Sequence, residues 1–313
     1  MVTPDSQGSN TQHACGKVIL LGEHSVVYGQ PALAAGLARG AEATLTPVDR
    51  ELVLDVDGLV SAITVNTDND LGRALASVSN ALESMGGRTP RGHLQAKLHL
   101  PAGGGVGSSA ALGVACARAL ALQSLGRALT LDESIELGTA WERVFHGNPS
   151  GLDHTAAAYG GVGIFVRGRG WTRVAMKRPL RVLFADTGER TPTKETVGNV
   201  AKLRERKPEM VDNSCEAIGV LVRNAALAVQ DADWRALGQL MDLNQNLLSG
   251  LMVSTERTEL LCRVARARGA FGAKLTGGGG GGCVIAIAPD DAQSAVLDAW
   301  RGEGARVFDA MIE

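Results

Sequence analysis

A glycine-rich segment is the stretch of this sequence that most clearly suggests chemistry. Residues 103–107 hold four glycines in five positions, and Ser108 and Ser109 follow at once. Glycine has no Cβ, so backbone N–H groups in such a segment can turn toward an anion and approach it closely. A small-residue helix predicted over residues 108–125 would add its own unbonded N–H groups and the positive end of its dipole. The segment therefore predicts a phosphate-binding loop, with a flexible turn before a helix as the alternative.

The two serines strengthen the phosphate-binding interpretation. A hydroxyl at this position can cap the helix and can also ligate a magnesium ion. The segment differs from a Walker loop because no Gly-Lys-Ser/Thr follows the glycines. It also differs from the dinucleotide-binding fingerprint in glycine spacing, and no acidic residue stands at the expected ribose position.

Two carboxylates are candidates for the remaining chemistry. Glu142 lies near the end of a helix that a capping box at Thr130 and Glu133 is predicted to open. Asp153 lies just beyond the loop of residues 146–151. Two acids placed at neighbouring turns of the chain can divide the work, one binding Mg²⁺ and the other accepting a proton from a hydroxyl. Either acid alone is more often a solvated surface residue.

A lysine and a second run of glycines are further candidates for the functional site. Lys17 lies in the apolar stretch 16–21, and a lysine in such a strand requires a carboxylate or phosphate partner. Six consecutive glycines occupy residues 277–282 between two apolar stretches that are predicted to be strands. A hairpin of this kind can press its backbone against a ligand, although glycine-rich segments are commonly plain linkers.

Composition limits the class of protein. The chain has 313 residues, 45% of them hydrophobic and 20% charged, which fits a globular protein with one large or two modest domains. The net charge of −2 gives no reason to expect nucleic acid or an anionic membrane as a partner. Five scattered cysteines without a C-x-x-C pair predict reduced thiols in a cytoplasmic protein. Residues 1–13 are polar and predict a disordered tail rather than a signal peptide.

The remaining patterns predict the elements that must position these residues. A strand over 94–100 precedes the first glycine segment, and a helix over 68–85 comes before it. In the second half, three helical patterns and the strands around the six glycines predict an antiparallel sheet backed by helices. The charged segment 191–208 is predicted to be mobile. Four histidines are predicted to be surface or loop residues rather than ligands: His13, His93, His99 and His154.

Three glycine-containing segments together resemble the GHMP kinase superfamily. Its first motif is matched by residues 16–24, its second by residues 101–111 and its third by residues 274–283. Within the superfamily, residues 22–29 and 146–153 most resemble the mevalonate kinase family. The resemblance implies an α+β fold of two domains: an N-terminal ATP-binding domain over 14–175, like domain 2 of ribosomal protein S5, and a C-terminal ferredoxin-like α/β sandwich over 176–313.

The same resemblance implies a role for each matching position. Asp153 matches the catalytic aspartate, and Lys17 matches the lysine that pairs with it and polarises the acceptor hydroxyl. Ser109 and Glu142 match the Mg²⁺ ligands, while Glu23 and His24 match the motif on the side of the acceptor substrate. The loop around the ATP phosphates is matched by Gly103, Gly104, Gly105, Val106, Gly107, Ser108 and Ser109. Gly278 stands where the family often has alanine.

The resemblance also implies partners and leaves alternatives. Mevalonate and ATP would be the substrates, Mg²⁺ the cofactor, and a homodimer one form of assembly that the sequence does not fix. Another GHMP kinase, acting on a sugar or on phosphomevalonate, is the nearest alternative, and His24 and the loop 148–151 argue against it. A relative that binds ligand without catalysis is the other. The cation for the mevalonate carboxylate is open between Arg190, Lys194 and others.

Overall fold

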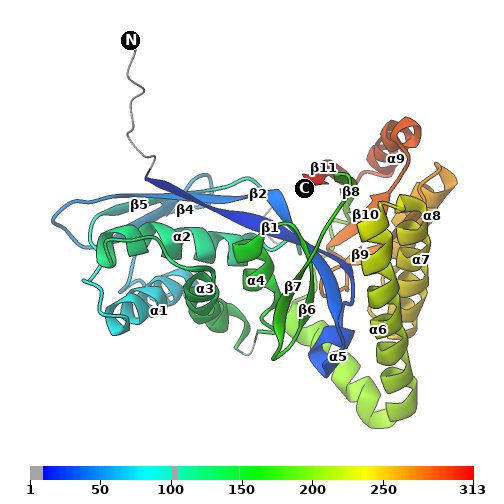
Figure 1. The fold of residues 1–313 in the computed structure, drawn as a ribbon, viewed down its shortest axis with the longest axis horizontal. Coiled ribbons are helices and arrows are strands. Elements are labelled where there is room, and N and C mark those ends of the chain that lie inside the picture. The colour runs from blue at the N-terminus through cyan, green and yellow to red at the C-terminus, as the bar shows by residue number, and fades with distance from the viewer. Residues whose placement is uncertain (1–9, 101–104, 148) are drawn as a thin grey trace.

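The computed structural model describes residues 10–100, 105–147 and 149–313, which form two β-sheets with helices packed against each (Figure 1). Within these residues the first sheet has seven strands, in the order β4-β3-β5-β2-β6-β7 with β1 paired to β2. Among the described strands of this sheet, only the β3–β5 pair is parallel. The strands are β1 (Thr11–Leu21), β2 (Ala32–Thr46), β3 (Val53–Val56), β4 (Val60–Thr64), β5 (His93–Leu98), β6 (Val162–Val166) and β7 (Gly170–Val174).

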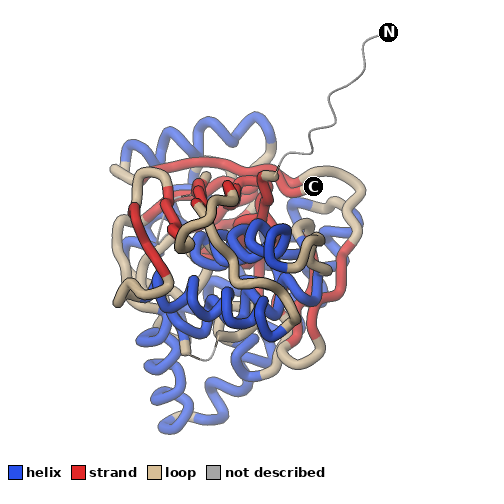
Figure 2. Tube along the Cα trace, turned by 90° about the vertical axis from the view of Figure 1, so that its left-hand side faces the viewer, coloured by secondary structure: helices blue, strands red, loops and turns tan. Residues whose placement is uncertain are grey.

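Four helices accompany the first sheet: α1 (Asp70–Ser84), α2 (Ser108–Ser124), α3 (Leu131–His146) and α4 (Leu152–Tyr159). Helices α1, α2 and α4 contact its strands, and α3 packs on these three helices. Figure 2, which faces this end of the molecule, shows them lying beneath the curved strands. Alanine, glycine and other small residues let α2 approach both the sheet and its neighbouring helices, and nearly all of its side chains are buried. The central helix therefore holds its N-terminus, with Ser108 and Ser109, at a fixed place beside β1.

The second sheet is antiparallel, with the strand order β11-β8-β10-β9. Its strands are β8 (Leu180–Asp186), β9 (Gly272–Thr276), β10 (Cys283–Ile287) and β11 (Arg306–Ile312). The accompanying helices are α5 (Thr193–Arg206), α6 (Pro208–Asp231), α7 (Trp234–Gly250), α8 (Glu256–Ala267) and α9 (Asp290–Gly302). The six glycines join β9 to β10, so the predicted hairpin is confirmed.

One apolar cluster runs through both halves of the molecule. It includes Val18 and Leu20 from β1, Phe184 from β8, Ile285 from β10 and Ile218 from α6, all fully buried. Among the described residues, three further clusters belong to one half each. The two sheets are therefore joined by a shared core rather than by a linker alone.

Most predicted elements are found close to their expected bounds. The helix predicted over 108–125 is α2, and the capping box at Thr130 and Glu133 opens α3, with both reciprocal hydrogen bonds formed. Among the described residues, no helix has the length and apolar character needed to cross a bilayer.

Two expectations for chain segments are wrong. The tail predicted over 1–13 is too long, because residues 11–13 belong to β1, where Thr11 Oγ1 lies 2.8 Å from Thr44 Oγ1 of β2. Residues 1–9 lie outside the described part of the chain. The segment 191–208, expected to be mobile, is largely the helix α5, which Thr196 and Val200 anchor through buried side chains.

Candidate active site

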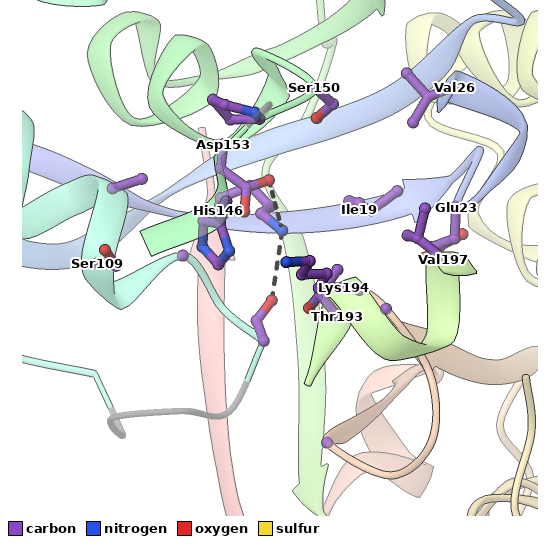
Figure 3. A pocket seen from close by; sticks show the side chains of 18 of the residues that line it. Ile19, Glu23, Val26, Ser109, His146, Ser150, Asp153, Thr193, Lys194 and Val197 are labelled. Atoms are coloured by element: carbon purple, nitrogen blue, oxygen red, sulfur yellow. Dashed lines mark hydrogen bonds and ion pairs between the residues drawn. The ribbon is translucent and has the colours of Figure 1, made fainter. Parts of the chain in front are cut away.

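A cavity of about 790 Å³ lies where the two sheets meet, and the polar residues singled out in the sequence line it (Figure 3). Its walls come from β1, the start of α2, the loop between α3 and α4, the start of α5 and the β9–β10 glycine loop. Asp153 and Lys194 reach this space from different helices. Residues far apart in the sequence thus share one pocket.

Lys17 and Asp153 form an ion pair at the centre of this cavity. Lys17 Nζ lies 2.9 Å from Asp153 Oδ1, and the lysine side chain is only 4% exposed whereas that of the aspartate is 37% exposed. Lys17 Nζ also donates to the carbonyl oxygen of Gly105 at 3.5 Å. The carboxylate partner expected for Lys17 is present, and Asp153 still faces solvent and can receive a ligand.

Glu142 and Ser109 form a second polar pair close by. The Ser109 hydroxyl donates to Glu142 Oε1 at 2.6 Å, and His146 Nε2 lies 3.4 Å from Glu142 Oε2 one helical turn further on. Burial raises the pKa of the Glu142 carboxyl, as does the charge of Asp153, against the hydrogen bond from Ser109 and the charges of His146 and Lys17. A buried carboxylate beside a hydroxyl suits a small divalent cation that also binds phosphate oxygens.

The described part of the first glycine segment packs directly on Lys17. The backbone N–H of Lys17 donates to the Val106 carbonyl at 2.8 Å, and the Val106 side chain is fully buried. Gly107 is the N-cap of α2, with no side-chain cap bond. The capping role expected for the serines is therefore wrong, since Ser109 points to Glu142 instead. Gly103 and Gly104 lie outside the described residues.

Gly107, at the N-cap, has no side chain that could accept from the first N–H groups of α2. Gly105, Gly107, Ser108 and Ser109 all line the cavity at this helix start. Helix N-termini bind anions because their first amides lack intrahelical acceptors and the dipole is positive there. The start of α2 can therefore hold a phosphate group.

Glu23 and His24, which follow β1, form another part of the cavity wall. The carboxylate of Glu23 pairs with the ammonium group of Lys274 on β9, and both side chains are fully buried. His24 Nε2 lies 2.9 Å from the carbonyl oxygen of Gly278 and must donate to it. Burial lowers the pKa of His24, which favours the neutral imidazole and leaves Nδ1 as an acceptor.

The cations considered for a substrate carboxylate have different surroundings. Arg190 donates two hydrogen bonds of 2.7 Å to the carboxylate of Asp186, so its guanidinium group is held against β8. Lys194, in the first turn of α5, lies at the cavity (Figure 3). Together with Lys17 these cations make the cavity suited to anionic substrates.

The sequence did not assign roles to all the residues that the structure places here. Lys274 lies in an apolar strand, as Lys17 does, and that same signal could have identified it. His146 lies four residues after Glu142, the spacing of helix neighbours. The expectation for His154 is wrong: it is buried in α4 and its Nε2 lies 2.8 Å from Thr139 Oγ1.

Comparison with known proteins shows the family to which this chain belongs. Residues 71–161 match the model of the GHMP kinases N terminal domain, and residues 225–306 match that of the GHMP kinases C terminal. Mevalonate kinase of Pyrococcus furiosus is 36% identical over 300 residues, with 88% of this chain and 87% of the relative covered. That of Methanothermobacter thermautotrophicus is 31% identical over 296 residues, with 91% and 93% covered.

Solved structures agree. The crystal structure of L. major mevalonate kinase in complex with R-mevalonate has a TM-score of 0.83 at 28% identity, covering 100% of this chain and 99% of that one. Mevalonate kinase of Methanococcus jannaschii has a TM-score of 0.84 at 25% identity, covering 98% and 99%. The chain belongs to the GHMP kinase superfamily and, within it, to the mevalonate kinase family. The two-domain α+β fold is confirmed, and the protein is an ATP-dependent kinase.

Proposed function

We propose that this kinase transfers the γ-phosphoryl group of ATP to the 5-hydroxyl of mevalonate, giving 5-phosphomevalonate and ADP in the mevalonate pathway of isoprenoid synthesis. The observation that carries the proposal is the Lys17–Asp153 ion pair, 2.9 Å long, in the same cavity as the start of α2. The mevalonate kinases that match along most of this chain support mevalonate as the acceptor.

The two charged groups have complementary roles in this transfer. Asp153 takes the proton of the acceptor hydroxyl, whose oxygen forms the new bond to the γ-phosphorus as the bond to the ADP oxygen breaks. Lys17 stabilises the negative charge that develops on the attacking oxygen. Asp153 also holds the ammonium group of Lys17 in place, so one contact serves both functions.

The phosphates of ATP are assigned to the first glycine segment and the start of α2. Gly105, Gly107 and Ser108 supply backbone around the phosphate groups, and Gly103 and Gly104 are assigned to the same loop from the sequence alone. We assign Mg²⁺ to Ser109 and Glu142, whose oxygens lie 2.6 Å apart and fit a cation that takes its other ligands from phosphate and water. When bound, Mg²⁺ neutralises charge on the transferred phosphoryl group.

A coupled ADP-release assay tests the proposed function. The purified chain is assayed with ATP and four acceptors in parallel: mevalonate, phosphomevalonate, galactose and homoserine. We expect kcat/KM for mevalonate to exceed those of the others by at least about 100-fold, since a site built around the acceptor's polar groups rejects molecules that lack them. Turnover of galactose or phosphomevalonate in preference to mevalonate would assign the chain to the alternative kinases. ATP binding without turnover of any acceptor would indicate a binding protein.

Three further assignments accompany this function. A cytoplasmic location is supported by the five cysteines, which are free thiols in the described structure. We assign the domain boundary to residues 175 and 176, and the position of these residues in the connection from β7 to β8 supports this assignment. A homodimer is carried over from the family resemblance, and light scattering on the purified chain tests it.

A further inference from the structure

Lys274 carries a buried charge that the phosphoryl-transfer mechanism does not use. It lies in β9 between apolar neighbours, and its side chain is fully buried. Its ammonium group donates to Glu23 Oε1 and to its own neighbour's carbonyl, that of Leu275. A buried ammonium group destabilises the fold unless it is paired with an opposite charge. Lys274 therefore needs the carboxylate of Glu23 beside it.

The other oxygen of the Glu23 carboxylate is left without a donor. Glu23 Oε2 is buried and has no hydrogen-bond partner among the described residues. Glu23 nevertheless lines the cavity, where Figure 3 places it near Val197 of α5. Leaving a buried carboxylate oxygen unbonded is costly, and a ligand hydroxyl entering the cavity would supply the missing donor.

Helix α7 holds the backbone on both sides of this pair. The side-chain oxygen of Asn244 accepts from the N–H of Gly22 at 3.3 Å, and that of Gln245 accepts from the N–H of Leu275 at 2.9 Å. Gln245 is itself fixed, because its Nε2 donates to Ser254 and to a carboxylate oxygen of α8. Both amides are buried. The neighbours of Glu23 and Lys274 are thus tied to one helix.

Glu23 lies at a different end of the cavity from the reacting groups. From Lys17 to the end of β1 at Leu21, a strand advances about 13 Å at roughly 3.3 Å per residue, and Glu23 follows in the next turn. The hydroxyl that is phosphorylated belongs beside Lys17 and Asp153. Glu23 is therefore placed to meet a more distant part of the acceptor.

We propose that Lys274 is a positioning residue for acceptor recognition: it holds Glu23 so that Oε2 accepts a hydrogen bond from a second hydroxyl of the acceptor, one that is not phosphorylated. This rests on the proposed function, in which the acceptor is a dihydroxy acid. Lys274 acts only through Glu23 and touches neither the nucleotide nor the reacting oxygen.

The wild-type chain gives the first test. Its kcat/KM is compared for mevalonate and for 5-hydroxy-3-methylpentanoate, which lacks the second hydroxyl. We expect a loss of at least about 100-fold for the analogue, because a site that hydrogen-bonds a hydroxyl leaves a buried group unpaired without it. A loss below threefold would overturn the proposal. Absence of turnover with mevalonate itself would instead contradict the proposed function.

Variants of Lys274 test whether this residue is responsible for the preference for mevalonate over the analogue. Lys274→Met should raise the KM for mevalonate by about 10-fold or more and leave the KM for ATP nearly unchanged. The preference for mevalonate over the analogue should fall to within about tenfold, because Glu23 is no longer held. The control is Lys177→Met, which removes a 69% exposed lysine paired to Asp231 and should change neither value.

The dependence of kcat/KM on pH distinguishes a positioning role of Lys274 from a general structural defect of the variant. The charged groups acting on Glu23 are Lys274 from β9 and Lys17 from β1, and Cys262 of α8 acts on Lys274. Without the ammonium group, Glu23 binds a proton at higher pH. The kcat/KM of Lys274→Met for mevalonate should therefore rise with pH relative to the wild type. A parallel, pH-independent loss for mevalonate and the analogue would show a merely structural role and overturn the proposal.

A double variant covers the case in which Lys274→Met does not fold. Glu23→Gln combined with Lys274→Met buries no unpaired charge and keeps side chains of similar size. It should bind ATP as the wild type does, yet discriminate poorly between mevalonate and the analogue. Wild-type discrimination in this variant would overturn the proposal.

Discussion

Several charged side chains of the site lie where burial makes an unpaired charge most costly. Lys17, Glu23, Glu142 and Lys274 are each at most 3% exposed, and all but Lys274 line the same cavity. Each is close to an opposite charge or a hydroxyl, which offsets part of the cost of leaving water. At the scale of single residues, the site is a set of buried charges fixed in position before a substrate arrives.

Asp153→Asn tests the proton acceptor. The amide keeps the size of the carboxylate but neither accepts a proton nor balances Lys17, so kcat should fall by about 10²–10⁴-fold. Affinity for a non-hydrolysable ATP analogue, measured by calorimetry, should change by less than about threefold, because that contact is made elsewhere. Asp132→Asn, at the exposed start of α3, is the control and should keep full turnover. A near-normal kcat in Asp153→Asn would remove Asp153 from the mechanism.

Glu142→Gln tests the proposed cation site. Glutamine can still accept from Ser109 but lacks the charge that a divalent cation requires. Binding of Mn²⁺ in the presence of the ATP analogue, followed by electron paramagnetic resonance, should weaken by at least about 10-fold. Glu136→Gln changes an exposed acid of the same helix and should leave Mn²⁺ binding intact. Equal Mn²⁺ affinity in both variants would place the cation elsewhere.

Sequence reasoning found the residues whose type was unusual for their surroundings. Lys17 stood out in an apolar strand, and the structure supplies the carboxylate that such a lysine needs. Lys274 presents the same signal, but its partner Glu23 lies 251 residues away along the chain. No local spacing relates the two, because only the packing of β9 against the turn after β1 brings them together. Pairing across the fold is the information that a single sequence lacks.

The start of α2 depends on a left-handed backbone conformation that favours glycine. Gly107 has φ +77°, and a Cβ there would lie 2.9 Å from the Cβ of Lys17. Gly107→Ala should lower the free energy of unfolding by about 2–3 kcal/mol, against about 1 kcal/mol for Gly86→Ala. Gly86 is the matched control because its φ is +87° and no described atom lies within 4 Å of an added Cβ.

Urea denaturation measures the free energy of unfolding of the Gly107→Ala and Gly86→Ala variants. The KM for ATP shows which of the two substitutions disturbs the active site. Only Gly107→Ala should raise that KM, because it displaces Lys17 and the adjoining N–H groups. Equal stability losses in the two alanine variants would mean that backbone conformation alone, without the close approach to Lys17, sets the requirement for glycine at Gly107.

The end of β8 is held by an ion-pair cluster that acid should loosen. Burial alone would raise the pKa of Asp186, but hydrogen bonds from Arg190, from the Gly188 N–H and from Arg306, with the charge of Arg190, lower it below 3.8. The stabilisation is therefore complete above the unfolded-state pKa and is lost as pH falls through the lower folded-state pKa.

Asp186→Asn should show this dependence directly. The variant should be less stable than the wild type by about 3 kcal/mol at pH 7, since the two arginines lose their buried partner. The difference should narrow below about pH 4, where the carboxylate begins to bind a proton in the unfolded wild-type chain but not yet in the folded one. Urea denaturation at pH 7, 5 and 3.5 measures it. A difference that stays constant across this range would mean that the Asp186 charge does not contribute.

Elements with a strong local signal were predictable, and those formed by tertiary contact were not. The capping box of α3 and the apolar spacing of α1 fix their helices locally. The helix α5 is mostly polar and becomes ordered because Thr196 and Val200 are buried against the rest of the molecule. β7 is likewise a short edge strand whose only described strand partner is β6.

At the scale of the whole molecule, the candidate active site lies at the contact between the two sheets. The N–H of Ile19 donates to Thr276 Oγ1 at 3.1 Å, and that hydroxyl donates back to the Ile19 carbonyl at 3.0 Å. These bonds connect β1 directly to β9 within the cavity wall. Because the residues that line the cavity come from both halves, the geometry of the site requires the halves to stay docked.

Phe184→Ala tests whether the shared core makes the two halves unfold together. Phe184 is fully buried in the cluster that also holds Val18 and Leu20, and its ring lies 4.5 Å from that of Phe308. Truncating it should lower the free energy of unfolding by about 3–5 kcal/mol. Since the cluster spans both sheets, the loss should appear in β5 as well as in β10.

Hydrogen exchange with mass spectrometry distinguishes the outcomes. Under conditions where exchange reports global opening, peptides from β5 and β10 should lose the same free energy of protection in Phe184→Ala, and neither should change in Leu59→Ala, whose side chain is 53% exposed. A loss confined to β8–β11 would show that the second sheet unfolds alone. In that case ATP bound at the first sheet would stabilise only its own half, whereas a single cooperative unit transmits the binding free energy to both.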